Sequence, residues 1–480
     1  MRRLITALSI LLSLAACSRV DGDLPGIAGL PPIEPDYTGV TVPPVIAPLD
    51  FVYLGDEPCR VFANGEKVHS RNGAVLFRRS QWKRLLASGS ITVSVQVKRD
   101  GQWMSFDPFC IYVSEDEIDP YVSYRLIPPG YQGWQQMGIY QRDLTSYRQS
   151  AIMENTLTGG NCMNCHTPSW GDPSRFVFHV RAAFGGTILA NGDILEKLNT
   201  KTDSTISALV YPAWHPKEDM VAFSVNKTLQ VFHAGGPNRI EVYDEASDVV
   251  VYDTGRHEVL WSPLTKSAEY FETFPYFSPD GKWLYFCSAE AVSPMPDQYN
   301  HAKYAIKRIA FDAATRTFGD ALETVFDAPA MGKSASFPRV SPDGKYLCFT
   351  LHEYGNFSIW HQDADLWLLD LATGKAAPMD AVNSDSVDSF HTWSSNSRWM
   401  VFSSRRDDGL YTKLYFSHID ENGNATKPFL LPQRNPVDYY KKLMFSYNLP
   451  QFMTGEVDLN KRRLLNVIRN SGGTDIKPAE

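Results

Sequence analysis

Short runs of alternating apolar and polar residues dominate the chain from residue 51 onward. One example is Ile91-Thr92-Val93-Ser94-Val95-Gln96-Val97, with Gly73, Gly89 and Gly101 near the expected turns. A period of two is typical of β-strands with one buried face. The pattern predicts a mainly β protein, beginning with a small antiparallel domain of sandwich type over residues 51–115.

A longer pattern occurs four times beyond residue 175. Each copy consists of a short strand, a polar turn and a second strand, and the copies begin at Tyr211, Phe274, Phe337 and Phe390. Two copies carry Ser-Pro-Asp-Gly at the turn, where proline presets the first turn position while Asp and Gly tolerate the tight reversal. Three copies are followed by another strand pair, and four strands are the unit of a propeller blade.

These repeats resemble the TolB-like β-propeller repeat over residues 176–433. The resemblance implies a propeller of five or six blades, although the first and fourth copies carry His215-Pro216-Lys217-Glu218 and Ser394-Ser395-Asn396-Ser397 at the turn. It also implies a role as an interaction platform, since TolB-like propellers commonly act in this way. Residues 116–175 are expected to form a connecting segment, and residues 434–480 a partly helical tail.

The chain begins with a charged and then an apolar segment that ends at Cys17. The apolar run from Leu4 to Ala16 is too short to span a bilayer, so residues 1–16 are predicted to be an export signal. Leu14-Ala15-Ala16-Cys17 resembles a bacterial lipobox, which implies lipidation of the Cys17 thiol; an ordinary secretory signal is the alternative. Ser18 fits the outer-membrane form of the motif, and the proline-rich residues 17–50 are expected to form an extended tether.

The composition and net charge limit the classes of partner that the chain is expected to bind. Removal of the signal changes the formal net charge from −8 to −10, so no basic surface for nucleic acid is expected. With 480 residues, 12% aromatic and only 21% charged, the chain is able to form more than one hydrophobic core.

A second motif lies in the expected connecting segment. Cys162-Met163-Asn164-Cys165-His166 has the Cys-x-x-Cys-His spacing of c-type haem attachment. In that chemistry the two thiols bond the two vinyl groups of one porphyrin, and the following imidazole is the proximal ligand of the iron. The motif predicts one covalent haem c, attached through Cys162 and Cys165 with His166 on the iron.

Two other uses of the cysteines are less consistent with the sequence. A redox disulfide of thioredoxin type needs a βαβ context, which this segment lacks, and a zinc site needs ligands that do not occur nearby. The distal iron ligand is less defined. His179 is the nearest downstream histidine and the first candidate; His215, His233 and His391 are others, and an open sixth position is a further alternative. A disulfide between Cys59 and Cys110 is also left open.

Three functions follow from these features. The first is an exported lipoprotein cytochrome that transfers electrons to a protein partner and uses the propeller as a docking scaffold. The second is a propeller that binds a protein or glycan, with the haem as a sensor or structural element. The third is an enzyme with an open haem site, such as a peroxidase. A propeller peptidase is disfavoured because no Gly-x-Ser-x-Gly motif occurs.

Overall fold

The computed structural model describes residues 24–128, 136–203, 205–236 and 238–479, and these separate into two compact units. Unit 1 contains residues up to 118 together with 144–147 and 426–443. Unit 2 contains the remaining described residues. The predicted export signal and Cys17 lie outside the described residues, so both the signal and the lipidation site stay predictions.

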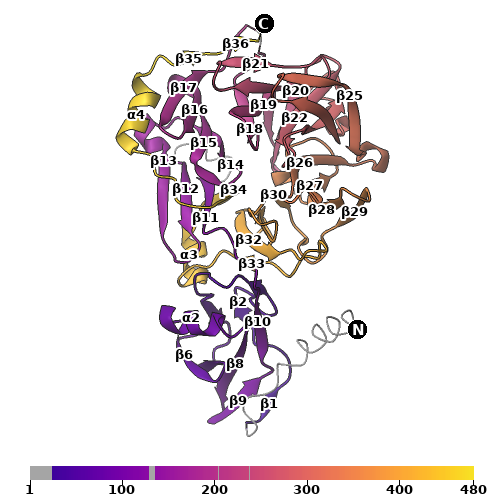
Figure 1. Ribbon diagram of the computed structural model, residues 1–480. Coiled ribbons are helices and arrows are strands. Elements are labelled where there is room, and N and C mark those ends of the chain that lie inside the picture. Colours follow the sequence, from indigo (N-terminus) through magenta and orange to yellow (C-terminus); the bar gives the residue numbers. More distant parts are fainter. Residues whose placement is uncertain (1–23, 129–135, 204, 237, 480) are drawn as a thin grey trace, which may run out of the picture. The chain divides into compact units, whose positions relative to one another are not determined.

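Unit 1 is built on one sheet with the strand order β1-β9-β8-β5-β6-β7-β4-β2, in which β10 pairs with both β8 and β3 (Figure 1). Its strands are β1 (Gly26–Ile27), β2 (Ile33–Glu34), β3 (Thr41–Val42), β4 (Phe51–Tyr53), β5 (Cys59–Ala63), β6 (Glu66–Arg71), β7 (Ala74–Leu76), β8 (Ser90–Arg99), β9 (Gln102–Phe106) and β10 (Phe109–Val113). The unit also contains α2 (Arg79–Leu86), β33 (Phe429–Leu430) and α3 (Pro436–Leu443).

Much of the expected tether is folded into unit 1. Tyr37, Val40 and Val42 are fully buried, and β1 and β3 pair in parallel with β9 and β10. The indole of Trp82 in α2 donates a hydrogen bond of 2.9 Å to the carbonyl of Ile46. Prolines favour extended backbone without requiring solvent exposure, and the apolar residues between them form core contacts here.

The possible bridge between Cys59 and Cys110 does not form, because Cys59 is a free thiol. The two cysteines lie on strands on opposite sides of β8, where Cys59 faces Val97 and Cys110 faces Thr92. Five residues along a strand span roughly 16 Å, well beyond the Cα separation of about 7 Å that a disulfide allows.

Unit 2 is mainly β, and within its described residues the strands form six sheets arranged like the blades of a propeller (Figure 1). The first has the order β13-β12-β11-β34, with β11 (Tyr121–Ile127), β12 (Gly138–Asp143), β13 (Gln149–Glu154) and β34 (Ser446–Met453). The second runs β14-β15-β16-β17-β35, with β14 (Met163–Ser169), β15 (Asp172–Val180), β16 (Gly186–Asn191), β17 (Ile194–Asn199) and β35 (Thr474–Asp475).

The other four sheets follow in chain order. The third contains β18 (Leu209–Trp214), β19 (Met220–Phe232), β20 (Ile240–Asp253), β21 (Glu258–Leu260) and β36 (Lys477–Pro478). The fourth contains β22 (Tyr270–Phe277), β23 (Trp283–Glu290), β24 (Ala305–Asp312) and β25 (Thr317–Phe326). The fifth contains β26 (Ser334–Val340), β27 (Tyr346–His352), β28 (Asp365–Asp370) and β29 (Lys375–Pro378), and the sixth β30 (Asp388–Trp393), β31 (Trp399–Ser404) and β32 (Lys413–His418).

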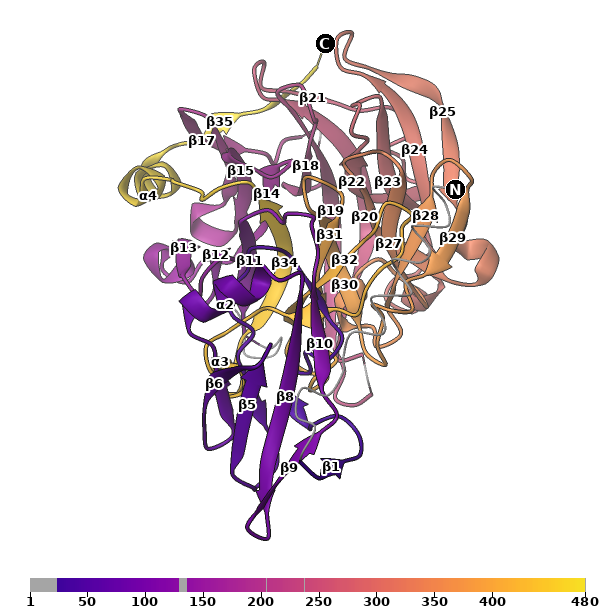
Figure 2. The same ribbon diagram turned by 60° about the horizontal axis from the view of Figure 1, so that its bottom comes forward.

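One strand of each sheet contacts its counterparts in the two neighbouring sheets, so the sheets form a closed ring. The contacts run from β14 through β18, β22, β26 and β30 to β34, and β34 in turn contacts β14. Figure 2 shows β34 between β14 and β30. The ring is therefore closed by a C-terminal strand that pairs with β11 of the first sheet.

The propeller-like unit is larger than the repeats indicate. Residues 116–175, predicted to be a connecting segment, contain β11, β12, β13 and β14 and the start of β15, and the predicted tail contributes β34 and α4 (Lys461–Asn470), whose Leu464 and Ile468 are buried. The second sheet turns at Trp170-Gly171, where both residues have positive φ, as a two-residue hairpin requires. It therefore lacks the Ser-Pro-Asp-Gly sequence that identifies the repeats.

The repeat turns form as their residues predict. The hydroxyls of Ser278 and Ser341 lie 2.5 and 2.6 Å from the carboxylates of Asp280 and Asp343, and each accepts a backbone N–H five residues later at 3.0 Å. In the first copy the Nδ1 atom of His215 accepts the N–H of Glu218 at 2.9 Å. His215 thus takes the place of the turn serine.

Candidate functional site

The six strands that contact one another around the closed ring, β14, β18, β22, β26, β30 and β34, form the inner ring of unit 2 and share one irregularity. Each has a two-residue bulge whose first member adopts a left-handed backbone, with φ between 50° and 54°: Cys165, Tyr211, Phe274, Phe337, Phe390 and Leu449. This backbone region is uncommon for residues other than glycine, so its recurrence marks the six positions as structurally equivalent.

Four of these six positions form an aromatic chain within the inner ring. The ring of Phe274 lies 4.6 Å from that of Tyr211 and 4.0 Å from that of Phe337, which lies 4.6 Å from Phe390. Cys165 has the smallest side chain of the six. A cavity of about 1100 Å³ lies beside it, bounded also by Tyr211, Phe390 and Leu449.

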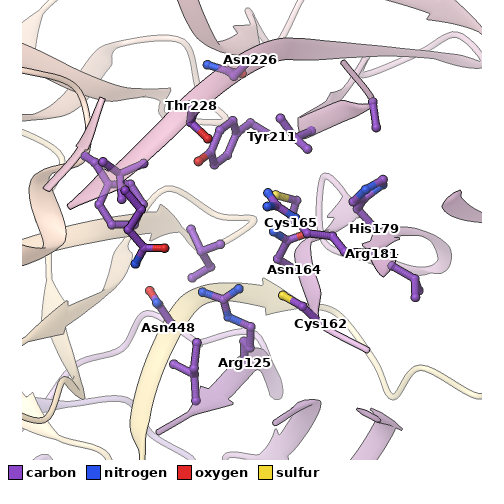
Figure 3. Close-up of a pocket in the computed structure, with 18 of the residues that line it drawn as sticks. Arg125, Cys162, Asn164, Cys165, His179, Arg181, Tyr211, Asn226, Thr228 and Asn448 are labelled. Carbon is purple, nitrogen blue, oxygen red and sulfur yellow. The ribbon is translucent and has the colours of Figure 1, made fainter. Parts of the chain in front are cut away.

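Both cysteines of the Cys-x-x-Cys motif line this cavity (Figure 3). Residues three apart on a regular strand face opposite sides, but the left-handed backbone of Cys165 interrupts the alternation between Asn164 and Thr167. Both are free thiols, with 8% and 4% of their surfaces exposed. Burial raises the pKa of Cys165, while the Tyr211 backbone and the positive charges of Arg181 and Arg125 act in the opposite direction.

The cavity lining is positively charged. It contains four basic side chains, Arg125, Arg181, Lys201 and Arg405, and one acidic side chain, Asp475. Among the described residues no carboxylate forms an ion pair with Arg125 or Arg181. The guanidinium of Arg405 lies 3.4 Å from the ring centre of Trp360, and burial lowers its pKa to about 9. The cavity therefore favours an anionic or acid-bearing ligand.

His166 lies outside the cavity lining. Its ring is 2% exposed and stacks against Phe176 of β15, with ring centres 6.0 Å apart. Neither ring nitrogen meets a partner at hydrogen-bonding geometry in the described part of the chain. Burial, and then the charge of Arg125, lowers the pKa of His166 to about 3, so the ring is neutral at physiological pH.

His179 does line the cavity, and it faces Asn164 across the pair β14 and β15. Its Nδ1 lies 3.2 Å from the hydroxyl of Thr187, which fixes the ring and leaves Nε2 as the nitrogen free to bind a ligand. Burial, and then Arg181, lowers the pKa of His179 to about 3. His215, His233 and His391 are not part of the lining.

Sequence reasoning identified the two cysteines and His179 but missed Arg125, Arg181 and Tyr211. Arg125 and Arg181 lie in segments without a repeat motif, so nothing in the sequence places them beside the cysteines. Tyr211 carried a weak signal, because it has a hydroxyl group where the three other repeat copies begin with Phe.

A haem c fits part of this site. The two thiols, and two arginines that form no ion pair among the described residues, suit a porphyrin with two carboxylates. The volume of about 1100 Å³ is slightly above the range of about 300–1,000 Å³ that is typical of cofactor pockets. His166 does not fit as it stands, because its ring does not reach the cavity. In the described residues no cluster of three or more His, Cys, Asp or Glu side chains is arranged to hold a metal ion by itself.

Neither a protein family nor a curated protein matches the sequence. Solved structures that are similar to the chain include prolyl oligopeptidase B from Galerina marginata, at 10% identity and a TM-score of 0.36, with 71% of this chain and 42% of that one covered. Dipeptidyl peptidase 4 from Porphyromonas gingivalis is similar at 9% identity and a TM-score of 0.32, covering 75% and 60%. An ancestral GH74 enzyme is similar at 10% and 0.35, covering 72% and 43%. The chain thus spans less than half of prolyl oligopeptidase B.

Across the described residues, none of the helices has both the length and the apolar character needed to cross a bilayer.

Proposed function

We propose that this protein is an exported lipoprotein cytochrome that carries one haem c in the cavity of unit 2 and transfers electrons. The observation that supports it best is that Cys162 and Cys165, spaced for two thioether bonds in the sequence, both line one cavity of suitable size. A bound haem would supply a one-electron change at iron, and the chain acts as a redox carrier without a substrate of its own.

The surrounding residues have separate roles in this proposal. The two thiols would hold the haem covalently through its vinyl groups, and Arg125 and Arg181 would pair with its propionates. Tyr211, Phe390 and Leu449 exclude water from the side of the cavity that faces the inner ring, and low polarity around a haem adjusts its potential.

A docking surface for a redox partner is available beside the cavity. The strands β19 and β20 are the longest in unit 2, and Phe232 at the end of β19 is 54% exposed while it also lines the cavity. Leu229 on the same strand is 38% exposed. Exposed apolar side chains next to a redox centre suit brief contact with a partner. The same surface is compatible with the alternative function, a six-bladed TolB-like propeller that binds a protein or glycan and uses the haem as a sensor.

Mass spectrometry of the denatured mature protein tests the haem. After expression with export and cytochrome c maturation, the chain is expected to carry the added mass of one haem, because thioether bonds survive unfolding. Replacing both Cys162 and Cys165 with Ala should remove this mass, whereas Cys59→Ala, outside the motif, should retain it. A mature wild-type chain without haem would exclude the cytochrome function and favour the binding module.

Location is tested separately through Cys17. We propose that its lipidated thiol holds the protein at the outer membrane, which residues 14–17 support by their resemblance to a lipobox. Cys17→Ala should release the protein into the soluble fraction or block its processing, as read by lipid labelling and fractionation. Unchanged labelling and membrane association in this variant would disprove the anchor.

A further inference from the structure

His166 occupies a position that belongs to the propeller repeat. It is the second residue of the β14 bulge, and the equivalent residues of the other five sheets are Pro212, Pro275, Pro338, His391 and Pro450. Four of the six positions are therefore proline, which has no N–H to donate. In all six strands the residue at this position has no paired residue on the neighbouring strand, because it lies in the bulge.

His391 allows a direct comparison, because it follows Phe390 and belongs to no haem motif. Like His166, it is 2% exposed, and in the described residues neither of its ring nitrogens meets a partner at full hydrogen-bonding geometry. Each ring has backbone groups near it, Ser123 for His166 and Cys348 and Phe337 for His391. The positive charge of an arginine in the preceding sheet lowers the pKa of each ring, Arg125 for His166 and Arg339 for His391. The buried, unpartnered state of His166 thus has an explanation in blade packing alone.

His179, unlike His166, lies at the cavity and is held through one ring nitrogen. It lines the cavity, its Nδ1 is held by Thr187, and the Thr187 hydroxyl is itself 3.4 Å from that of Thr200. Its cross-strand neighbour is Asn164, which lies between the two cysteines in sequence. An imidazole fixed through one nitrogen is the usual arrangement of a histidine that binds a metal through the other.

We infer that the histidine ligand of the haem iron is His179, and that His166 is a blade-packing residue in spite of its place in the Cys-x-x-Cys-His motif. The inference rests on the proposed function, because it assigns a ligand within the same site. It withdraws from His166 the ligand role that the motif predicts, and it keeps on the iron His179, the first candidate for the distal ligand.

The ligand role is tested on the haem-loaded full-length protein. Covalent haem mass and the absorption and electron paramagnetic resonance spectra are recorded for the wild type, His179→Ala and the control His215→Ala, which alters a turn outside the cavity. We expect all three to keep the haem mass, His179→Ala alone to lose the histidine-ligated spectrum, and added imidazole to restore it. Retained haem mass with an unchanged spectrum in His179→Ala would overturn the inference and leave the cytochrome function standing. Loss of haem mass in the wild type would overturn both.

The packing role is tested without haem, on the full chain produced without the maturation system. His166→Pro should shift the thermal unfolding midpoint by less than about 3 °C, because proline already stands at four equivalent positions. A loss of cooperative unfolding would show that His166 is not an ordinary member of the repeat. His391→Pro, at the equivalent position of the sixth sheet, is the matched control and should give a similarly small shift of the unfolding midpoint.

Discussion

The second and sixth sheets begin with the same local backbone but differ in what lies beside it. Both inner strands place a left-handed residue before a buried histidine, Cys165-His166 in one and Phe390-His391 in the other. Phe390 packs against Phe337 in the inner ring, whereas Cys165 adjoins a cavity of about 1100 Å³. The contrast indicates that an aromatic ring at this backbone position packs against its neighbour in the inner ring, whereas the smaller Cys165 leaves space beside it.

The largest expected effect comes from making the second sheet resemble the sixth. Cys165→Phe should occupy the part of the cavity beside β14 and abolish covalent haem attachment, whereas Cys165→Ser should still carry one haem through Cys162. Mass spectrometry of the denatured proteins measures the difference. If Cys165→Phe retained haem, or lowered the free energy of unfolding relative to Cys165→Ser, the space beside Cys165 would not accept an aromatic ring.

Removing an aromatic ring from the packed side should be costly for stability. Phe337 is 2% exposed and lies between Phe274 and Phe390, so Phe337→Ala should reduce the free energy of unfolding by about 3–5 kcal/mol. Chemical denaturation measures this. Haem attachment should survive in the folded fraction, because Phe337 does not line the cavity. A loss below about 1 kcal/mol would mean that the aromatic chain contributes little.

The two histidines at equivalent bulge positions, His166 and His391, should make the stability of the fold sensitive to acid. Burial lowers the pKa of His391 to about 3, below its ordinary value of 6.5, so the unfolded chain binds a proton that the folded chain does not. Its contribution to stability is complete above pH 6.5 and decreases as the pH falls from 6.5 toward 3. Between pH 6.5 and 5 this amounts to at most about 2 kcal/mol per histidine. His391→Gln should reduce the loss seen in denaturation at these two pH values. An identical loss would assign the effect to other groups.

The smallest expected effect concerns the Trp170-Gly171 turn of the second sheet, which lacks the Ser-Pro-Asp-Gly sequence of the repeats. Gly171 has φ of 86°, and a Cβ there would meet only ordinary contacts, the nearest 3.6 Å from the carbonyl oxygen of Phe452. Gly171→Ala should therefore cost only the left-handed backbone, about 1–2 kcal/mol. Denaturation of the variant beside Gly344→Ala, whose φ is 73° in the fifth sheet, is expected to give similar values. A much larger loss at Gly171 would mean that the hairpin of the second sheet depends on more than its backbone.

The predictable parts of the fold are those with local signals. Ser278 and Asp280 specify a turn within a few residues, so the four central sheets could be placed from sequence. β34 could not be joined to β11 in this way, because its pairing partners are more than 300 residues away and no local pattern encodes them. The two cysteines were found by their spacing. Arg125 and Arg181 lie far apart in the sequence, and the arrangement of the sheets in a ring brings both to the same cavity. The equivalence of His166 and His391 depends on the strand register, which the sequence does not give.

Closure of the ring by β34 also sets an order of events for an exported chain. Under the proposed function the chain is translocated from its N-terminus, so that Cys162 and Cys165 leave the membrane well before Ser446, Asn448 and Leu449, which complete the wall of the cavity. Pairing over so long a separation is slow compared with the folding of single sheets. Under the proposed function this interval would leave the cysteines accessible to a haem-attachment enzyme, and the last strand would then close the cavity around the haem.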